Sequence, residues 1–205
     1  MKTYLPILIF FIFRLLHAQN TAPVLDGVVE EQEWKDAQNF TLNYEVDPGD
    51  NTPPPHQTKA YIKYTKTDLY VGFIAYADMN NLRSSIRNKD EGFRDDNVLF
   101  GFDAYGDGRY MIAQGTNQKA IKSTSKYSLM AVTITMMSMF ESKATKHQNN
   151  YQVELKIPFA NLQFKPAAEM RWKVVFARNT FTENTRSQSI NFPIDRTLDL
   201  QIIKQ

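Results

Sequence analysis

Residues 59–76 read KAYIKYTKTDLYVGFIAY, and this stretch decides the fold class. Residues 59–64 alternate between polar and apolar side chains, a pattern that predicts a strand with one buried face. The polar residues 65–68 predict a turn. Residues 69–76 are almost all apolar, which predicts a central strand that is buried on both faces. The whole stretch therefore predicts a β-hairpin.

More short strands are predicted on both sides of this hairpin, separated by turn-forming residues. Their ranges are 24–27, 40–46, 97–104, 110–114, 151–157, 171–179 and 190–192. Residues 30–37 predict one or two helical turns, the Pro-rich residues 47–57 a surface loop, and residues 78–96 a polar loop or short helix. Eight or so short strands without a long helix favour an all-β fold, an antiparallel β-sandwich of two sheets with a jelly-roll-like arrangement.

The composition excludes several classes of function. The 205-residue chain has no cysteine, so it has no disulfide, thiol nucleophile or Cys-based zinc site. Its formal net charge of +2 gives no support to nucleic-acid binding. The histidines after residue 18, His56 and His147, lie in a Pro-rich loop and a polar linker, so a Ser-His-Asp triad or a His-based metal centre is not expected. The sequence therefore favours a protein that is not an enzyme.

Residues 1–18 have the pattern of a secretory signal peptide. Lys2 gives a positive start, residues 5–16 form an apolar run, and Ala18 supplies the small residue of a cleavage site. The alternative is an uncleaved membrane anchor, but the run is shorter than the roughly 20 residues that a spanning helix needs. We therefore expect an exported domain over residues 19–205 that is periplasmic, outer-membrane-associated or secreted.

Four motifs follow one another along the chain. They are PVLDG at residues 23–27 with Glu33-Trp34, AYI and DLYVGF at residues 60–62 and 68–73, RDDNV at residues 94–98 with Asp103, and VELKIPF at residues 153–159 with Leu162. In this order and spacing, from about residue 23 to residue 193, the chain resembles the carbohydrate-binding module family 9-like domain. More narrowly, it resembles the version at the N-terminus of large bacterial outer-membrane proteins of unknown function.

The resemblance implies a β-sandwich that binds a polysaccharide or oligosaccharide through aromatic residues, often with structural calcium. It also implies an outer-membrane β-barrel after the domain, so a chain that stops at residue 205 is expected to be a fragment or a shortened relative. Residues 129–140 (LMAVTITMMSMF) stand where the relatives have an acidic, Trp-containing segment. Ordinary codons for residues 130–139, taken one base earlier, give an acidic stretch. We therefore hypothesise a local frameshift, which the gene sequence would test.

Several rings and one arginine are candidates for sugar binding. Rings stack on sugars, an arginine can donate hydrogen bonds to their hydroxyls, and sandwiches present such groups in loops. The candidates in or near loops are Tyr44, Phe93, Arg94, Tyr105 and Tyr127. An ion pair with a neighbouring aspartate is the alternative for Arg94. The rings expected in the core instead are Trp34, Tyr61, Tyr70, Phe73 and Trp172.

Four aspartates are candidate calcium ligands: Asp26, Asp95, Asp96 and Asp103. Calcium takes six to eight oxygen ligands, which carboxylates and carbonyls supply. The spacing does not match an EF-hand, and the alternative is a set of turn-forming aspartates on a solvated surface.

The sequence leaves three functions open. The first is a non-catalytic carbohydrate-binding module of an exported cell-envelope protein linked to polysaccharide breakdown or uptake. The second is a structural or interaction domain of an outer-membrane β-barrel protein without a sugar ligand. The third, a glycoside hydrolase fragment, has the least support, because 22 acidic residues make some pair of carboxylates inevitable.

Overall fold

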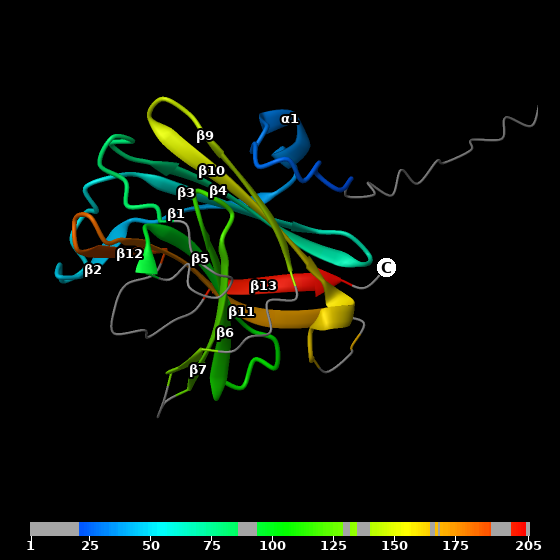
Figure 1. The fold of residues 1–205 in the computed structure, drawn as a ribbon. Helices are drawn as coiled ribbons and strands as arrows, with labels where there is room; N and C mark the ends of the chain where they lie inside the picture. The colour runs from blue at the N-terminus through cyan, green and yellow to red at the C-terminus, as the bar shows by residue number, and fades with distance from the viewer. Residues whose placement is uncertain are drawn as a thin grey trace, which may run out of the picture.

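The computed structural model describes residues 21–85, 94–128, 132–134, 140–164, 167, 169–189 and 198–203. Within these ranges the chain forms two antiparallel sheets that pack face to face (Figure 1). The predicted all-β sandwich is therefore confirmed. In the same ranges no helix is long and apolar enough to cross a membrane.

The first sheet, sheet A, has the predicted hairpin at its centre. Its strands in spatial order are β1 (Gln38–Thr41), β3 (Thr58–Tyr64), β4 (Asp68–Tyr76), β10 (Asn150–Pro158) and β9 (Glu141–Lys146). Strand β4 is covered on both faces, as its continuous apolar run predicts. Val71 and Phe73 are fully buried between the sheets, and Tyr70 is buried against Trp34 on the opposite face.

The second sheet, sheet B, is larger. In spatial order it contains β2 (Tyr44–Asp47), β12 (Thr185–Gln188), β11 (Glu169–Thr180), β5 (Asn97–Asp103), β6 (Tyr110–Asn117), β7 (Lys122–Ser128) and β8 (Val132–Ile134). An eighth strand, β13 (Leu198–Ile203), pairs with the first half of β11, while β12 pairs with its second half.

The core between the sheets is aromatic toward one end and polar toward the other. Phe100, Phe102 and Trp172 stack in sequence, with ring centroids 5.3 and 5.8 Å apart. Burial of each such ring stabilises the fold by about 1.5–3 kcal/mol. Toward the other end, Nη1 of the buried Arg178 donates hydrogen bonds to Thr58 Oγ1 at 3.1 Å and to the Tyr76 carbonyl at 2.7 Å. Arg178 thereby ties the second half of β11 to sheet A.

The N-terminal segment covers the outer face of sheet A. Its short helix α1 (Glu31–Trp34) puts Trp34 over the sheet, where only 3% of the residue is exposed. The carboxylate of Glu154, on β10, accepts hydrogen bonds from the backbone N–H of Asp26 and Gly27 and from Trp34 Nε1, at 3.0, 2.8 and 3.0 Å. Burial raises the pKa of Glu154 to about 7, although the three hydrogen bonds lower it. These contacts join the first and last of the four motifs physically.

Some sequence predictions were wrong in detail. Residues 24–27 form no strand, because the backbone N–H groups of Asp26 and Gly27 donate to Glu154 and that of Val24 donates to Glu33 instead of to a neighbouring strand. The single strand predicted over residues 40–46 is two strands, β1 and β2, which belong to different sheets and are separated at Leu42 and Asn43. The predicted tail contains β13, and strands β7, β9 and β12 were not foreseen. The strand predicted at residues 190–192 lies outside the described residues.

Candidate functional site

Three asparagines form a row across sheet B, on the face that points away from the core. Asn97 of β5 lies directly opposite Asn117 of β6 on one side and Asn179 of β11 on the other. Directly paired residues point to the same face of a sheet, so the three side chains are neighbours. Arg186 of β12 extends the row, since it pairs with Asn179.

Side-chain hydrogen bonds run along this row from Arg186 to Asp95, and Asn117 bonds to Asp95 from the other side. Arg186 Nε donates to Asn179 Oδ1 at 2.9 Å, and Asn179 Nδ2 donates to Asn97 Oδ1 at 3.1 Å. Asn97 Nδ2 then donates to the carbonyl of Asp95 at 2.6 Å, and Asn117 Nδ2 donates to Asp95 Oδ2 at 3.2 Å. The contacts of Asn97 and Asn117 with Asp95 are buried, and a satisfied buried polar network is rigid. Arg186, at the exposed end of the row, is held by one hydrogen bond.

Asp96 holds the next layer of the site together. Its fully buried carboxylate accepts hydrogen bonds from the backbone N–H of Arg83, at 2.9 Å, and from the N–H and hydroxyl of Thr182, at 3.2 and 3.0 Å. Thr182 lies in the turn between β11 and β12. Asp96 thus joins the segment after β4 to the tip of the β11–β12 hairpin.

An exposed aromatic ring lies at that hairpin tip. Phe181 is 42% exposed, and the guanidinium carbon of Arg83 lies 5.9 Å from the centroid of its ring. Arg83 Nε is 3.8 Å from Asp95 Oδ1, so this guanidinium lies within reach of both the ring and the buried carboxylate. We call the group of Arg83, Asn179, Phe181 and Arg186 the hairpin-tip site.

The tip is also held from its other side. His56, in the Pro-rich loop before β3, is 2.7 Å from a carboxylate oxygen of Glu183 through its Nε2 atom. The loop of residues 47–57 therefore contacts the same tip as Arg83 does. The site combines one exposed ring with two guanidinium groups and a fixed amide, a set that suits a flat ligand with many hydroxyl groups.

Comparison with known proteins agrees with this architecture. The family model described as carbohydrate family 9 binding domain-like matches residues 25–195. The chain belongs to this family. A family 9 carbohydrate-binding module from Caldicellulosiruptor kristjanssonii, solved with cellotriose, superposes with a TM-score of 0.66 at 15% sequence identity, covering 90% of this chain and 91% of that one. A structure of a family 9 module from the same organism with glucose gives a TM-score of 0.63 at 16% identity, covering 89% and 91%. No curated protein matches the chain.

The sugar-binding residues predicted from sequence do not come together in one place. Arg94 is exposed and precedes Asp95, and Tyr44 on β2 pairs with Gln188 on β12. Arg94 and Tyr44 therefore lie toward the hairpin-tip half of sheet B. Tyr105, which is 46% exposed, follows the opposite end of β5 and contacts Tyr110 edge to face at 6.1 Å.

Two of the predicted sugar contacts have no described side chain. Tyr127 lies on β7 opposite Met111, with only its backbone position described. Phe93 lies outside the described residues, as do most of the Met-rich residues 129–139.

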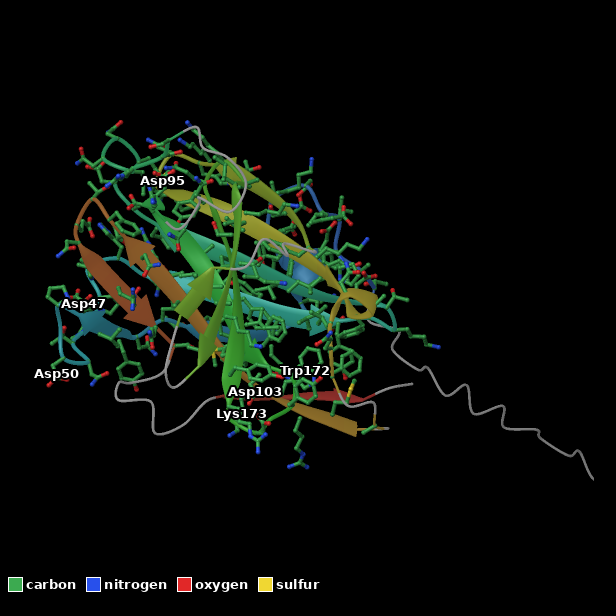
Figure 2. All side chains as sticks on the ribbon, turned by 60° about the horizontal axis from the view of Figure 1, so that its bottom comes forward. Asp47, Asp50, Asp95, Asp103, Trp172 and Lys173 are labelled. Atoms are coloured by element: carbon green, nitrogen blue, oxygen red, sulfur yellow. The ribbon has the colours of Figure 1, made fainter. Side chains whose placement is uncertain are left out.

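The four candidate calcium ligands of this family member are likewise dispersed. Asp95 precedes β5 and Asp103 is its last residue, so the two lie toward opposite ends of the strand, as Figure 2 shows. Asp26 lies on sheet A beside Glu154. The Asp103 carboxylate accepts the backbone N–H groups of residues 105, 106 and 108, at 2.8–3.0 Å, which is the alternative role of an aspartate that shapes a turn. Within the described ranges, no group of three or more acidic, His or Cys side chains is arranged to hold a metal ion.

The hairpin-tip site itself was missed in the sequence. Residues 178–186 read RNTFTENTR, a short polar segment with one aromatic at its centre that ends in arginine. A strand followed by such a turn is a hairpin signal, and an aromatic at the turn has no core to enter. That pattern points to Phe181, but nothing in it indicates the contact with Arg83, almost a hundred residues earlier.

Proposed function

We propose that the chain is a non-catalytic carbohydrate-binding module and that the hairpin-tip site binds the sugar. The observation that carries this proposal is the exposed ring of Phe181 beside Arg83, next to a row of hydrogen-bonded side chains. The C–H face of a pyranose ring packs on an aromatic ring, and fixed polar groups bind its hydroxyls. The family membership of the chain and the sugars in the two superposed structures support the same function.

The supporting residues give the site the rigidity that sugar binding needs. Sugars lose many bonds to water on binding, so the polar groups that replace water must already be in place. Asp95 and Asp96 are fully buried and hold the side chains of Asn117 and Thr182 by hydrogen bonds. Neither carboxylate is exposed to a ligand, so their role is to position the exposed groups.

We further propose that the module is exported and acts in the cell envelope, as a periplasmic, outer-membrane-associated or secreted domain. The apolar run at residues 5–16 followed by Ala18 supports export. Mass spectrometry of the protein from its native cells tests this. A mature chain that starts at Gln19 is expected, and a mature chain that keeps residues 1–18 would contradict export.

Isothermal titration with cellotriose, glucose and a panel of soluble plant and bacterial oligosaccharides tests sugar binding. The matched variants are Phe181→Ala and Tyr105→Ala, since each removes an exposed ring, at opposite ends of sheet B. We expect Phe181→Ala to weaken binding of the preferred glycan about 10-fold to 100-fold, from the apolar area of one ring. Tyr105→Ala should leave binding unchanged.

Each other outcome has a defined meaning. If Tyr105→Ala abolishes binding and Phe181→Ala does not, the module binds sugar at the Tyr105 end and the hairpin-tip site is wrong. If the folded wild-type chain binds no glycan in the panel, the proposal of a carbohydrate-binding module fails. An interaction domain without a sugar ligand is then the better description.

A further inference from the structure

Each guanidinium group of the hairpin-tip site has a polar contact through its Nε atom, a hydrogen bond for Arg186 and an ion pair for Arg83. Arg186 is fixed through its Nε atom by Asn179, and Arg83 Nε lies nearest to the carboxylate of Asp95. The Nη groups of both arginines have no hydrogen-bond partner among the residues that the structure describes. Arg186 is exposed, and the Arg83 side chain is 51% exposed. Each guanidinium therefore presents free N–H groups to solvent.

Both guanidinium groups belong to one connected network. The bonds run from Arg186 through Asn179 and Asn97 to Asp95, whose side chain is paired with Arg83. Side chains that are already fixed lose little conformational entropy when they bind a ligand. The planar fork of arginine also matches the two oxygens of a carboxylate, which the ammonium group of lysine does not.

Among the residues that the structure describes, the carboxylates near these arginines make no hydrogen bond to their Nη groups. Asp95 and Asp96 are fully buried beneath the site. Glu183 is bound by His56 at the hairpin tip. Asp47 lies opposite Arg186 in the β12–β2 pairing, yet no ion pair joins the two within the described parts of the chain. Positive charge thus faces solvent on both arginines, of which Arg83 lies beside Phe181.

We propose that the hairpin-tip site selects acidic glycans, with the carboxylate of a uronic acid bound by Arg83 and Arg186 and the sugar ring on Phe181. This inference rests on the proposed function and specifies its substrate class. A neutral sugar would leave the free guanidinium groups paired only with hydroxyls or water. A carboxylate makes charge-assisted hydrogen bonds, which are about twice as strong.

A pair of ligands that differ in one group tests the inference. Oligogalacturonate and oligomannuronate are titrated against the wild-type chain, beside the same oligosaccharides after chemical reduction of each carboxylate to a primary alcohol. We expect the acidic form to bind about 10-fold to 100-fold more tightly than the reduced form, as loss of a charge-assisted hydrogen bond predicts. Poly-glutamate, a polyanion without sugar rings, should not bind.

Matched charge removals locate the effect. Arg83→Gln and Arg186→Gln should each remove most of the preference for the acidic form, so that the ratio of the affinities for the acidic and reduced forms falls toward one. Arg109→Gln is the control, because Arg109 is 82% exposed at the other end of sheet B and its loss changes the net charge equally. A melt by circular dichroism confirms that each variant is folded.

The results separate this inference from the proposed function. Equal binding of acidic and reduced oligosaccharides would overturn the acidic preference and leave sugar binding intact. Binding of poly-glutamate as tight as that of the uronates, or an equal loss in Arg109→Gln, would also overturn it, because the attraction would then be a general charge effect. No binding of any glycan would refute both proposals.

Discussion

Glu154 is the residue whose removal should most disturb the covering of sheet A. In Glu154→Ala the backbone N–H groups of Asp26 and Gly27 and the indole N–H of Trp34 lose their common acceptor. Two of these contacts, those of Gly27 and Trp34, are buried, so water does not replace the carboxylate at them. A buried donor left without a partner costs about 1–3 kcal/mol, so the two together predict a loss of about 2–6 kcal/mol in the free energy of unfolding.

Urea unfolding followed by tryptophan fluorescence measures this loss. The chain has two tryptophans, and they report different regions: Trp34 lies under the N-terminal segment, and Trp172 lies in the core. In a Glu154→Ala chain that also carries Trp172→Phe, the signal of Trp34 should change at lower urea than the far-ultraviolet circular dichroism does. Local release of residues 21–37 then precedes global unfolding.

Lys156→Ala is the control for the same strand and face. The Lys156 ammonium makes a surface ion pair with Glu141 at 3.4 Å, and such exposed pairs contribute little to stability. Unfolding of Glu154→Ala at the same urea concentration as Lys156→Ala would refute this role of Glu154. In that case another contact, such as that of Gln152 with the Val29 N–H at 2.6 Å, would be holding the segment.

Three further predictions concern stability. Because burial raises the pKa of Glu154 from 4.5 to about 7, the folded state binds more protons than the unfolded state between these values. The free energy of unfolding should therefore fall as pH rises from about 4.5 to 7, and urea titrations at each pH measure this. The same titrations of Glu154→Gln should show no such fall. Gly27→Ala should lower the melting temperature more than Gly108→Ala. Both glycines have a positive φ, but of the two only Gly27 lies so close to other backbone that an added Cβ would be 2.7 Å from the nitrogen of Ala144. Equal shifts in melting temperature would contradict this prediction. Asp103→Ala should cost about 1–3 kcal/mol by freeing the turn N–H groups it binds, and millimolar calcium should not change the melting temperature of wild type. A calcium-dependent rise that Asp103→Ala removes would instead make Asp103 a calcium ligand.

Local patterns were enough to predict the sandwich. Three stretches predict which side chains are buried: the alternating residues 59–64 and 151–157 and the apolar run at residues 69–76. Burial of these side chains requires a second sheet that packs against the first. The rings of Phe73 and Trp172 were placed in the core for the same reason, and they are buried there. These features depend on neighbours within a few residues, so the sequence contains them directly.

Edges and crossings could not be predicted in this way. The polar residues 141–146 and 185–188 form strands because a longer strand, β10 or β11, offers them a free edge. The break at Leu42 moves the chain from sheet A to sheet B, which no periodicity within residues 40–46 reveals. These segments have little intrinsic preference for the β conformation, and pairing with a neighbouring strand stabilises them instead.

The sequence by itself determined the fold class, the family and the residues of the core, because hydrophobic periodicity and motif order are written along the chain. The tertiary structure alone decided the candidate site. Arg83 contacts both Asp95 and Phe181 because Asp96 binds the hairpin tip. Arg186 is linked to Asp95 through Asn179 and Asn97 because β5 and β11 are neighbours in sheet B. It also decided that Glu154, one polar residue in an alternating strand, is buried rather than solvated. Contacts between residues about a hundred positions apart depend on how the sheets assemble, and no local pattern specifies that.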